Sequence, residues 1–347
     1  MKILGFVSFY TSVPFWANNF ISSEELEKIE EEELKNKLQE VVFSKENDDF
    51  SIKIAQDGMI ILRVYKLENN MVPWSDRLNN PDYTISNDIK NWNDYIEYLN
   101  AFYLILDSSL FELEKETFLE INQLTKKDVM RAYFAYFDSL EKFQGCQSAS
   151  HNQEPIEIYK KNRLPDSNYH LIKSKNNRFI TKKVLEHTVE NFEYACKDYN
   201  LIKILSTLLR SISEYKEGNN QTSILFSWFI IESIIIQIWE EHINSLNNSF
   251  DDGSKRINKA RKKHLENLSI SVIINLLELM NLIPYKLYIE IDKIRLCRNK
   301  IVHIDQDYIS TNNDAKESIL CTKNLIKLNY NLDIFPNLGL IISPITI

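Results

Sequence analysis

The segment Arg295–Asp305, "RLCRNKIVHID", contains two side chains that could act together on a phosphate ester. Arg298 carries a planar guanidinium that keeps its charge and matches phosphate oxygens with two parallel N–H donors. His303 follows five residues later, and an imidazole with an ordinary pKa of about 6.5 can accept or donate a proton near neutral pH. The two residues therefore predict a site that binds a phosphodiester and moves a proton beside it.

Arg298 stands where the helical pattern calls for an aliphatic residue. Leu287, Ile291, Ile294, position 298 and Ile301 follow one another at steps of +4, +3, +4 and +3, which is the spacing of a buried helix stripe. An unpaired guanidinium costs several kcal/mol to bury. We therefore expect Arg298 to find a carboxylate, a water molecule or a polar cleft.

Glu232 is likewise a charged residue where an apolar residue is expected, in the very apolar segment Gln221–Ile243. It lies in line with Phe229 and Ile236, so a carboxylate interrupts a second apolar stripe. Two opposite charges on facing helices predict an ion pair between Glu232 and Arg298, which would orient the guanidinium. The alternative is a purely structural pair that holds a helical bundle together, with His303 capping its helix end.

Arg298 and His303 do not stack on each other in one helix. Five residues leave them about 140° apart around the axis and about 7.5 Å apart along it. A second copy of the helix, crossing the first, would bring both groups onto one phosphate more easily. This geometry favours a two-fold homodimer with a composite cleft.

The run Arg298-Asn299-Lys300-Ile301-Val302-His303 resembles the R-[polar]-x3-H motif of HEPN domains, in the form RN-x-x-x-H. The upstream "SWFIIESI" resembles the Apea-like branch of that superfamily. The likeness covers roughly residues 180–330. It implies a helical bundle that dimerises and often acts as a metal-independent RNA endonuclease, in antiphage (antiviral) defence or toxin–antitoxin systems. Many members of the family are non-catalytic.

The resemblance and the chemistry of RNA together suggest a role for each residue. The ribose 2′-OH is the nucleophile, so neither a cofactor nor a metal is required. His303 would carry the acid and base work, and Arg298 would stabilise the transition state. Asn299 would orient the substrate or the histidine, and Glu232 would position Arg298. The products of this hydrolase-class site would be a 2′,3′-cyclic phosphate and a 5′-hydroxyl.

A basic loop upstream could contact the RNA backbone. The segment "SKRINKARKKH" concentrates positive charge in an otherwise acidic protein, as nucleic-acid sites do. The predicted RNA-binding residues are Lys255, Arg256, Lys259, Arg261, Lys262, Lys263 and Lys300. A solvated segment joining two helices is the alternative.

The composition limits the other possibilities. A net charge of -8 over 347 residues argues against a protein that coats nucleic acid with its whole surface. The chain has only 6 Gly and lacks a glycine-rich phosphate loop. The four cysteines form no C-x-x-C pair, and the N-terminus lacks the features of a signal peptide. The apolar run Ile224–Trp239 is short for a membrane span and contains Glu232. We expect a reduced, cytoplasmic protein without a membrane partner.

The organisation predicted for the chain is an N-terminal α+β module followed by an all-α bundle. Residues 1–145 form the module, 146–178 a polar linker, and 179–335 the HEPN-like bundle. In the bundle, helices are predicted at 181–197, 199–216, 220–246, 268–281, 285–302 and 311–330, from apolar spacing and punctuation by Gly and Pro.

In the module, an acidic helix is predicted over "EELEKIEEEELKNKLQEVVF" after a capping box at Ser22 and Glu25. Two strands are predicted to meet at Asp57-Gly58. Helices are predicted at 89–106 and 126–143.

The leading hypothesis is a HEPN-type endoribonuclease whose N-terminal module senses, binds or regulates, with an antitoxin or a defence-system protein as a possible partner. The alternative is a non-catalytic HEPN module for dimerisation or for binding RNA or protein. A third hypothesis places the activity in the N-terminal module, but no cluster of residues in that module indicates a catalytic activity.

Overall fold

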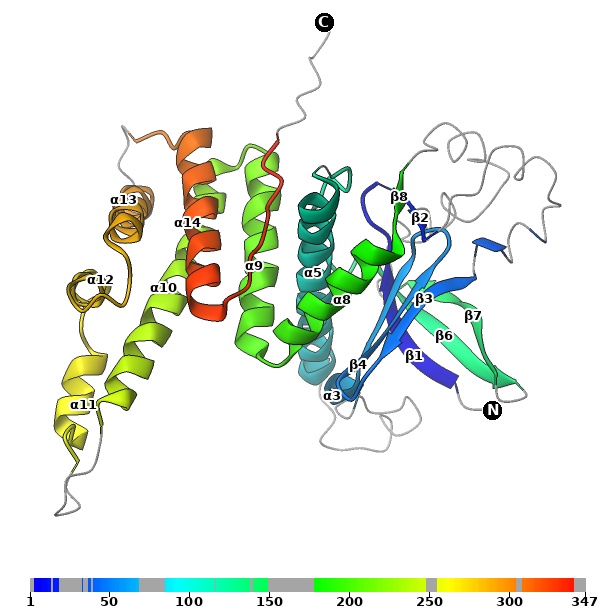
Figure 1. Cartoon of the computed structure of the whole chain (residues 1–347), viewed down its shortest axis with the longest axis horizontal. Coiled ribbons are helices and arrows are strands. Elements are labelled where there is room, and N and C mark those ends of the chain that lie inside the picture. Colours follow the sequence, from blue (N-terminus) through cyan, green and yellow to red (C-terminus); the bar gives the residue numbers. More distant parts are fainter. Residues whose placement is uncertain are drawn as a thin grey trace, which may run out of the picture. The chain divides into compact units, whose positions relative to one another are not determined.

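The computed structural model divides the chain into two compact units, Met1–Ser206 (unit 1) and Thr207–Ile347 (unit 2). Unit 1 contains a β-sheet with helices, and unit 2 is built from helices (Figure 1). The prediction of an α+β part followed by a helical part is confirmed at this level. The described residues are 3–13, 15–18, 33, 37–38, 40–68, 85–115, 117–137, 140–148, 178–247, 255–303 and 308–339.

The main sheet of unit 1 has six strands in the order β3-β4-β5-β1-β6-β7, with every neighbouring pair antiparallel. A small parallel pair joins β2 to β8. The strands are β1 (Ile3–Phe9), β2 (Trp16–Ala17), β3 (Val41–Glu46), β4 (Phe50–Ala55), β5 (Ile60–Val64), β6 (Val129–Phe137), β7 (Leu140–Ser148) and β8 (Phe179–Ile180).

The hairpin predicted at Asp57-Gly58 is confirmed as the connection between β4 and β5. Ala55 N donates to Met59 O at 3.0 Å, so the turn consists of Gln56, Asp57 and Gly58. Gly58 has φ +81°, in the left-handed region that glycine adopts readily. The Asp57 carboxylate accepts the Met59 N–H at 3.2 Å and closes the turn.

The helix predicted at 126–143 is wrong, because this segment forms the antiparallel strands β6 and β7. β6 pairs with β1 along its length, from Ile3↔Ala135 to Phe9↔Val129. The local spacing of apolar residues suited a helix, but pairing with β1 provides backbone partners that the sequence pattern alone does not reveal.

The predicted acidic helix is described only in part. Residues 19–32, 34–36 and 39 lie outside the described residues, and Glu33, Lys37 and Leu38 are helical. The end of the prediction is wrong, since Val41–Glu46 is strand β3 and pairs with β4. The β-branched and aromatic residues Val41, Val42 and Phe43 favour a strand over a helix end.

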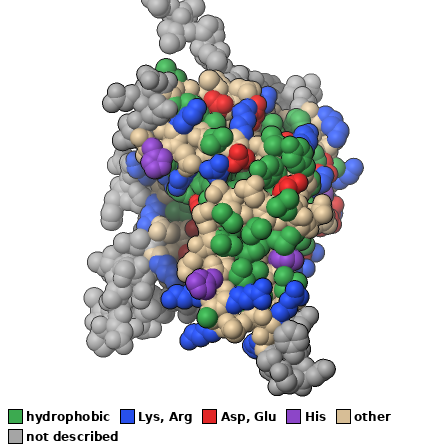
Figure 2. Space-filling model, turned by 90° about the vertical axis from the view of Figure 1, so that its left-hand side faces the viewer, with side chains coloured by type: hydrophobic (Ala, Val, Ile, Leu, Met, Phe, Trp, Pro, Cys, Tyr) green, Lys and Arg blue, Asp and Glu red, His purple; other side chains and the backbone are tan. Residues whose placement is uncertain are grey.

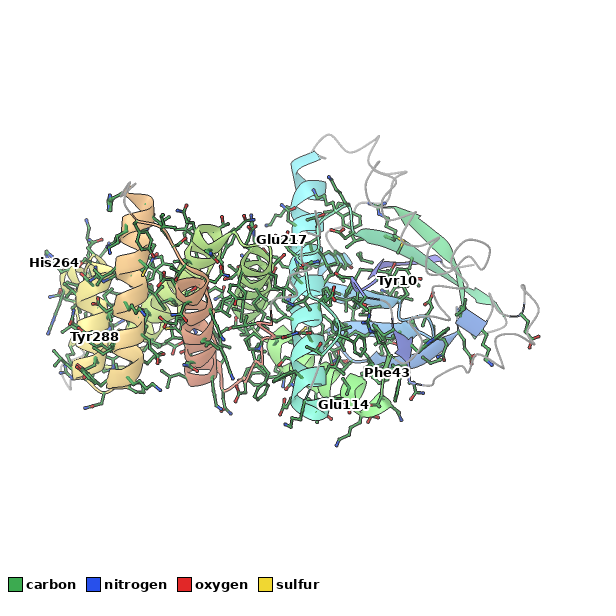
Figure 3. The ribbon with its side chains drawn as sticks, turned by 90° about the horizontal axis from the view of Figure 1, so that it is seen from above. Tyr10, Phe43, Glu114, Glu217, His264 and Tyr288 are labelled. Atoms are coloured by element: carbon green, nitrogen blue, oxygen red, sulfur yellow. The ribbon has the colours of Figure 1, made fainter. Side chains whose placement is uncertain are left out.

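Three helices lie wholly within the described part of unit 1: α3 (Tyr65–Glu68), α5 (Ile85–Glu114) and α8 (Lys182–Cys196). The helix predicted at 89–106 is thus confirmed and is longer than expected. α8 packs on α5, and Phe192 contacts both the Phe50 ring of β4 and the Phe102 ring of α5 at 5.2 Å between centroids. Figure 3 shows α5 beside the sheet, with Glu114 at its end and Tyr10 among the strands.

These contacts place α8 in unit 1, whereas the sequence suggested that the helical bundle begins at residue 179. The division between the units falls at Ser206, inside helix α9 (Tyr199–Lys216). The physical reason is that the buried side of α8 faces α5 and the sheet. Of the predicted linker 146–178, residues 149–177 lie outside the described residues, and its first residues belong to β7.

The helices after α9 are α10 (Asn220–Ser245), α11 (Lys259–Glu266), α12 (Ile270–Leu279), α13 (Tyr285–Val302) and α14 (Asn312–Tyr330). The six predicted helices between 181 and 330 are all confirmed, with ends within two residues. α10 contacts α12, α13 and α14. It approaches α9 and α14 through small hydroxyl side chains, since Ser211 Oγ lies 2.8 Å from Ser227 Oγ and Thr322 Oγ1 donates to the Ser227 carbonyl.

Candidate functional site

Helix α13 carries the predicted site residues in and just after its last turn. Its inner stripe, Leu287, Ile291 and Ile294, is buried as the spacing predicted. Arg298, Asn299 and Lys300 belong to the last turn, and His303 is the C-cap residue, whose backbone N–H donates to the Asn299 carbonyl at 2.9 Å. The candidate site therefore lies at the C-terminal end of one helix.

The Arg298 side chain is half-buried and is only partly satisfied by hydrogen bonds. Its Nη1 donates to Oδ1 of Asn299 at 3.2 Å. Its Nε is buried and has no hydrogen-bond acceptor among the described residues. An unsatisfied buried donor costs about 1–3 kcal/mol. An anion that bound at this guanidinium would relieve that cost.

The predicted ion pair between Glu232 and Arg298 is not present among the described side chains. Glu232 is half-exposed on α10, between Phe229 and Ile236 on the same apolar line, and both of these are exposed. The line that looked buried from spacing alone thus borders on solvent. Glu232 can be hydrated without a cationic partner, so the charge of Arg298 is not neutralised from α10.

The His303 ring is exposed, and one chain does not bring it to the Arg298 guanidinium. The two positions differ by about 140° around the α13 axis, and their side chains share no hydrogen bond in this part of the structure. Position 303 instead continues the outer line of α13 that contains Tyr285, Ile289 and Leu296, all within about 40° of it.

Tyr308 is a neighbour of this helix end that sequence reasoning missed. Lys300 Nζ lies 5.2 Å from the centroid of its ring. Burial, and secondly the adjacent Cys297 thiol, raise the pKa of the Tyr308 hydroxyl. The only signal in the sequence was an aromatic residue shortly after His303, and the intervening residues 304–307 lie outside the described chain.

The predicted basic loop is in part a helix, α11, which is a correction to the sequence interpretation. Asn258 caps it by accepting the Arg261 N–H at 2.9 Å. Lys262 forms an i,i+4 ion pair with Glu266 at 3.7 Å. No residue of α11 is buried, and its basic side chains, with those just before it, point to solvent: Lys255, Arg256, Lys259, Arg261 and Lys263 are all exposed.

An apolar face covers the outer side of α12 and α13. We call this the α12–α13 face and define it by four side chains: Leu279 is 73% exposed, Tyr285 66%, Leu296 49% and Ile289 47%. Figure 2 shows hydrophobic side chains gathered across this end of the protein, with lysines and arginines near its lower edge. Figure 3 places Tyr288 of α13 and His264 of α11 at the same end of unit 2. Soluble monomers rarely expose apolar patches larger than a few hundred Å².

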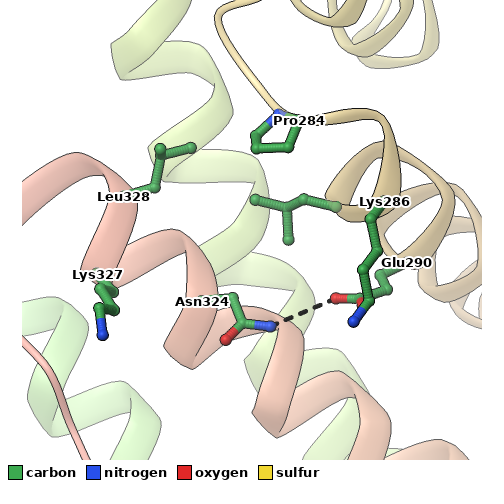
Figure 4. A pocket seen from close by; sticks show the side chains of 7 residues that line it. Pro284, Lys286, Glu290, Asn324, Lys327 and Leu328 are labelled. Atoms are coloured by element: carbon green, nitrogen blue, oxygen red, sulfur yellow. Dashed lines mark hydrogen bonds between the residues drawn. The ribbon is translucent and has the colours of Figure 1, made fainter.

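A shallow pocket in unit 2 lies away from the candidate site. It is lined by the first half of α13 and by α14 (Figure 4). In it, Asn324 Nδ2 donates a hydrogen bond to Glu290 Oε2 at 3.5 Å. Arg298 and His303 do not line it. In the described residues, no group of three or more His, Cys, Asp or Glu side chains could hold a metal ion.

Comparisons with protein-family models, with curated proteins and with solved structures found no match. Helix α10 is long and apolar enough to cross a membrane, but half of its most apolar window is buried inside the protein. A buried core helix passes the same test of length and composition, so α10 is weak evidence for a membrane.

Proposed function

We propose that unit 2 is a metal-independent endoribonuclease of the HEPN type, acting as a homodimer. The observation that supports this most is the state of Arg298. Its guanidinium is half-buried, and among the described residues its Nε has no acceptor and no carboxylate forms an ion pair with it. A positive group without a counter-ion in this part of the chain, within two helical turns of an exposed imidazole, suits a phosphodiester substrate.

In the proposed reaction the ribose 2′-OH attacks the adjacent phosphorus and the bond to the 5′-oxygen breaks. In the composite cleft of the dimer, one His303 takes the proton of the 2′-OH and the partner's His303, protonated, gives a proton to the leaving 5′-oxygen. Arg298 stabilises the charge on the phosphorane oxygens, and Asn299, bonded to Arg298, holds the guanidinium in place. The products are a 2′,3′-cyclic phosphate and a 5′-hydroxyl, so no water or metal takes part in the step.

The α12–α13 face supports the dimer. Its exposed side chains offer apolar area on the order of 500 Å², compared with about 800 Å² per partner in a standard interface. The occupant we propose is a second copy of the chain, because position 303 lies on the same line of α13 as Tyr285 and Leu296. A copy docked here would bring its own α13 end to the first and make the cleft composite.

The exposed basic residues before and in α11 would bind the RNA backbone, with Lys300 closer to the scissile phosphate. Such contacts are electrostatic and weaken with salt. Unit 1 would have a sensing or regulatory role. A cytoplasmic place in a toxin or antiviral defence system, with an antitoxin or another defence protein as partner, belongs to this proposal.

The test compares wild type, His303→Ala and His264→Ala on total RNA in the presence of EDTA. His264 is a matched control, since it is also an exposed histidine of unit 2. We expect wild type and His264→Ala to leave cyclic-phosphate ends. We expect His303→Ala to cleave RNA at least about 100-fold more slowly than wild type. Cleavage that survives in His303→Ala, or that EDTA abolishes, would contradict the proposed mechanism.

A non-catalytic HEPN module for dimerisation or for RNA or protein binding is the second candidate. The wide angle between Arg298 and His303, and the role of His303 as a helix C-cap, favour it. Intact RNA with every variant, combined with a dimer that binds RNA in a salt-dependent manner, would support this candidate over the enzyme.

A further inference from the structure

Three oxygen-bearing side chains meet where helix α9 begins, within unit 1. The hydroxyl of Tyr199, the first residue of α9, lies 2.7 Å from Oδ1 of Asp94 and 2.9 Å from Oε2 of Glu97. Asp94 and Glu97 are i,i+3 neighbours on α5, so their carboxyl groups lie on one side of that helix. Both distances are those of good hydrogen bonds.

The number of protons decides whether both contacts can be hydrogen bonds. A tyrosine hydroxyl has one proton to donate, and an ionised carboxylate can only accept. With both carboxylates ionised, Tyr199 could donate its proton to only one of them. The oxygen of the other carboxylate would then face the lone pairs of the tyrosine hydroxyl without a proton between them. A proton on one carboxyl removes the conflict, because that group donates to Tyr199 while Tyr199 donates to the other.

We propose that Glu97 holds this extra proton and donates it to Tyr199, which donates to Asp94, so that the three side chains form a proton-dependent clasp between α5 and the start of α9. The roles follow from the surroundings of each group. Glu97 is half-buried, and burial is the largest influence on its carboxyl and raises its pKa overall, with Asp94 adding to the effect, although the contacts with Tyr199 and Lys203 each lower the pKa. Burial and both carboxylates also raise the pKa of Tyr199, which keeps its hydroxyl protonated.

Other charged and titratable groups surround the clasp. Lys203 of α9 and Lys66 of α3 lie 4.5 and 5.4 Å from the centroid of the Tyr199 ring, and each favours ionised carboxylates. Tyr98 stacks on Tyr199 at 6.0 Å between centroids. Asp198 caps the same helix end by accepting the Asn200 N–H at 2.8 Å.

Two further groups act on Tyr98. The Cys196 thiol of α8 and Asp49 of the β3–β4 turn, together with Asp94 and Glu97, raise the pKa of Tyr98 beyond the effect of burial. Burial likewise raises the pKa of Cys196 itself. Both groups are therefore neutral over the range in which a carboxyl titrates, and they do not reverse the sign of the effect.

The sign of the pH effect follows from Glu97. A carboxyl whose pKa is raised in the folded protein favours the folded contact at low pH and loses that contribution as the pH rises through the raised value. The clasp therefore predicts that the start of α9 loosens as pH rises.

The location suggests what the clasp controls. α9 begins in unit 1 and its last ten residues belong to unit 2, so a clasp at its first residue sets how firmly this shared helix is attached to unit 1. The inference does not depend on the proposed ribonuclease activity, since it uses only contacts within unit 1.

The experiment is hydrogen exchange on the full chain from about pH 5 to about pH 8, corrected for intrinsic exchange rates. In wild type, we expect the protection of the amides in the first turn of α9, from Ile202, whose N–H donates to the Asp198 carbonyl, to fall about tenfold over this range as the contact between Glu97 and Tyr199 is lost. Glu97→Gln keeps a neutral donor and should remain protected at every pH. Tyr199→Phe keeps the ring stack and should be weakly protected throughout.

Glu114→Gln, at the exposed end of the same helix α5, is the matched control and should behave as wild type. A flat wild-type profile, or protection that rises with pH, would overturn the proposal. It would equally be overturned if Glu97→Gln kept the pH dependence of wild type.

Discussion

The two units differ in what they bury and in what they leave exposed. Unit 1 buries amide and carboxylate side chains. The Asn100 side-chain amide donates to the Leu124 carbonyl and accepts the Leu124 N–H, and the Asp57 carboxylate accepts the Tyr10 hydroxyl. In the described part of unit 2, the buried polar residues are serines and threonines, such as Ser211 and Thr322. Unit 2 instead leaves Leu279, Tyr285 and other large apolar side chains exposed.

This difference teaches how each unit is completed. Buried polar side chains cost free energy unless every group finds its partner, so they specify one internal arrangement. Unit 1 satisfies many of its buried groups from within. Small hydroxyls bonded to helix carbonyls specify less, and an exposed apolar face is completed by another surface. We therefore expect unit 2, more than unit 1, to depend on a partner.

The largest expected effect is on self-association. Ile289→Glu together with Leu296→Glu places two charges per copy on the α12–α13 face, and should weaken the dimer about 1000-fold, or roughly 4 kcal/mol. Analytical ultracentrifugation measures the change. Leu320→Glu on α14, which replaces a similarly exposed leucine, should leave the dimer intact. A wild-type chain that stays monomeric at high concentration would remove the contrast between the units.

The next effect compares two left-handed glycines, one in each unit. A Cβ on Gly58 would lie 2.5 Å from the backbone oxygen of Phe15, whereas a Cβ on Gly218 would meet nothing within 4 Å. Both have φ near +80°. Gly58→Ala should cost unit 1 about 3 kcal/mol, from strain plus the clash, and Gly218→Ala about 1 kcal/mol from strain alone. Hydrogen exchange of amides in each unit reports the two values separately, and equal losses would contradict this account.

The smallest effect concerns two tyrosine hydroxyls. The fully buried Tyr103 donates through Oη to the carbonyl of the buried Leu119 at 3.0 Å and accepts the part-buried Ser12 N–H at 3.1 Å. Tyr288 Oη donates to Asn275 at 3.0 Å at the surface. Tyr103→Phe leaves the buried Leu119 carbonyl unpaired and should lower the free energy of unfolding of unit 1 by about 1–2 kcal/mol, whereas Tyr288→Phe should change that of unit 2 by under about 0.5 kcal/mol. Denaturant titration followed by unit-specific exchange tests the difference.

Apart from α11, the helices between residues 181 and 330 could be predicted closely because a helix is determined by nearby residues. The apolar spacing of α13, the glycine after α9 and the proline before α13 mark these elements within a few positions of their ends. The tight turn at Gly58 was predictable for the same reason. The strands β6 and β7 were not, because the partner of β6 is β1, more than a hundred residues away in the chain.

The candidate site shows the same limit. The spacing of α13 was enough to place Arg298 on its inner stripe and His303 at its end. It could not show that Glu232 borders on solvent, because that depends on which side of α10 the other helices cover. The contacts of Tyr308 with Lys300 and Cys297 could not be predicted from the sequence either. A segment that follows a helix and folds back onto it gives no periodic pattern in the sequence.

By itself, the amino-acid sequence determined the helical register of unit 2, the hairpin at Gly58 and the odd position of a guanidinium among aliphatic residues, because each depends on neighbours along the chain. Only the tertiary structure decided that 129–137 and 140–148 are strands, that Arg298 has no carboxylate partner among the described residues and that α13 turns an apolar face outward. These features depend on which distant segments pack together, because those contacts determine which side chains are buried and which groups form hydrogen bonds.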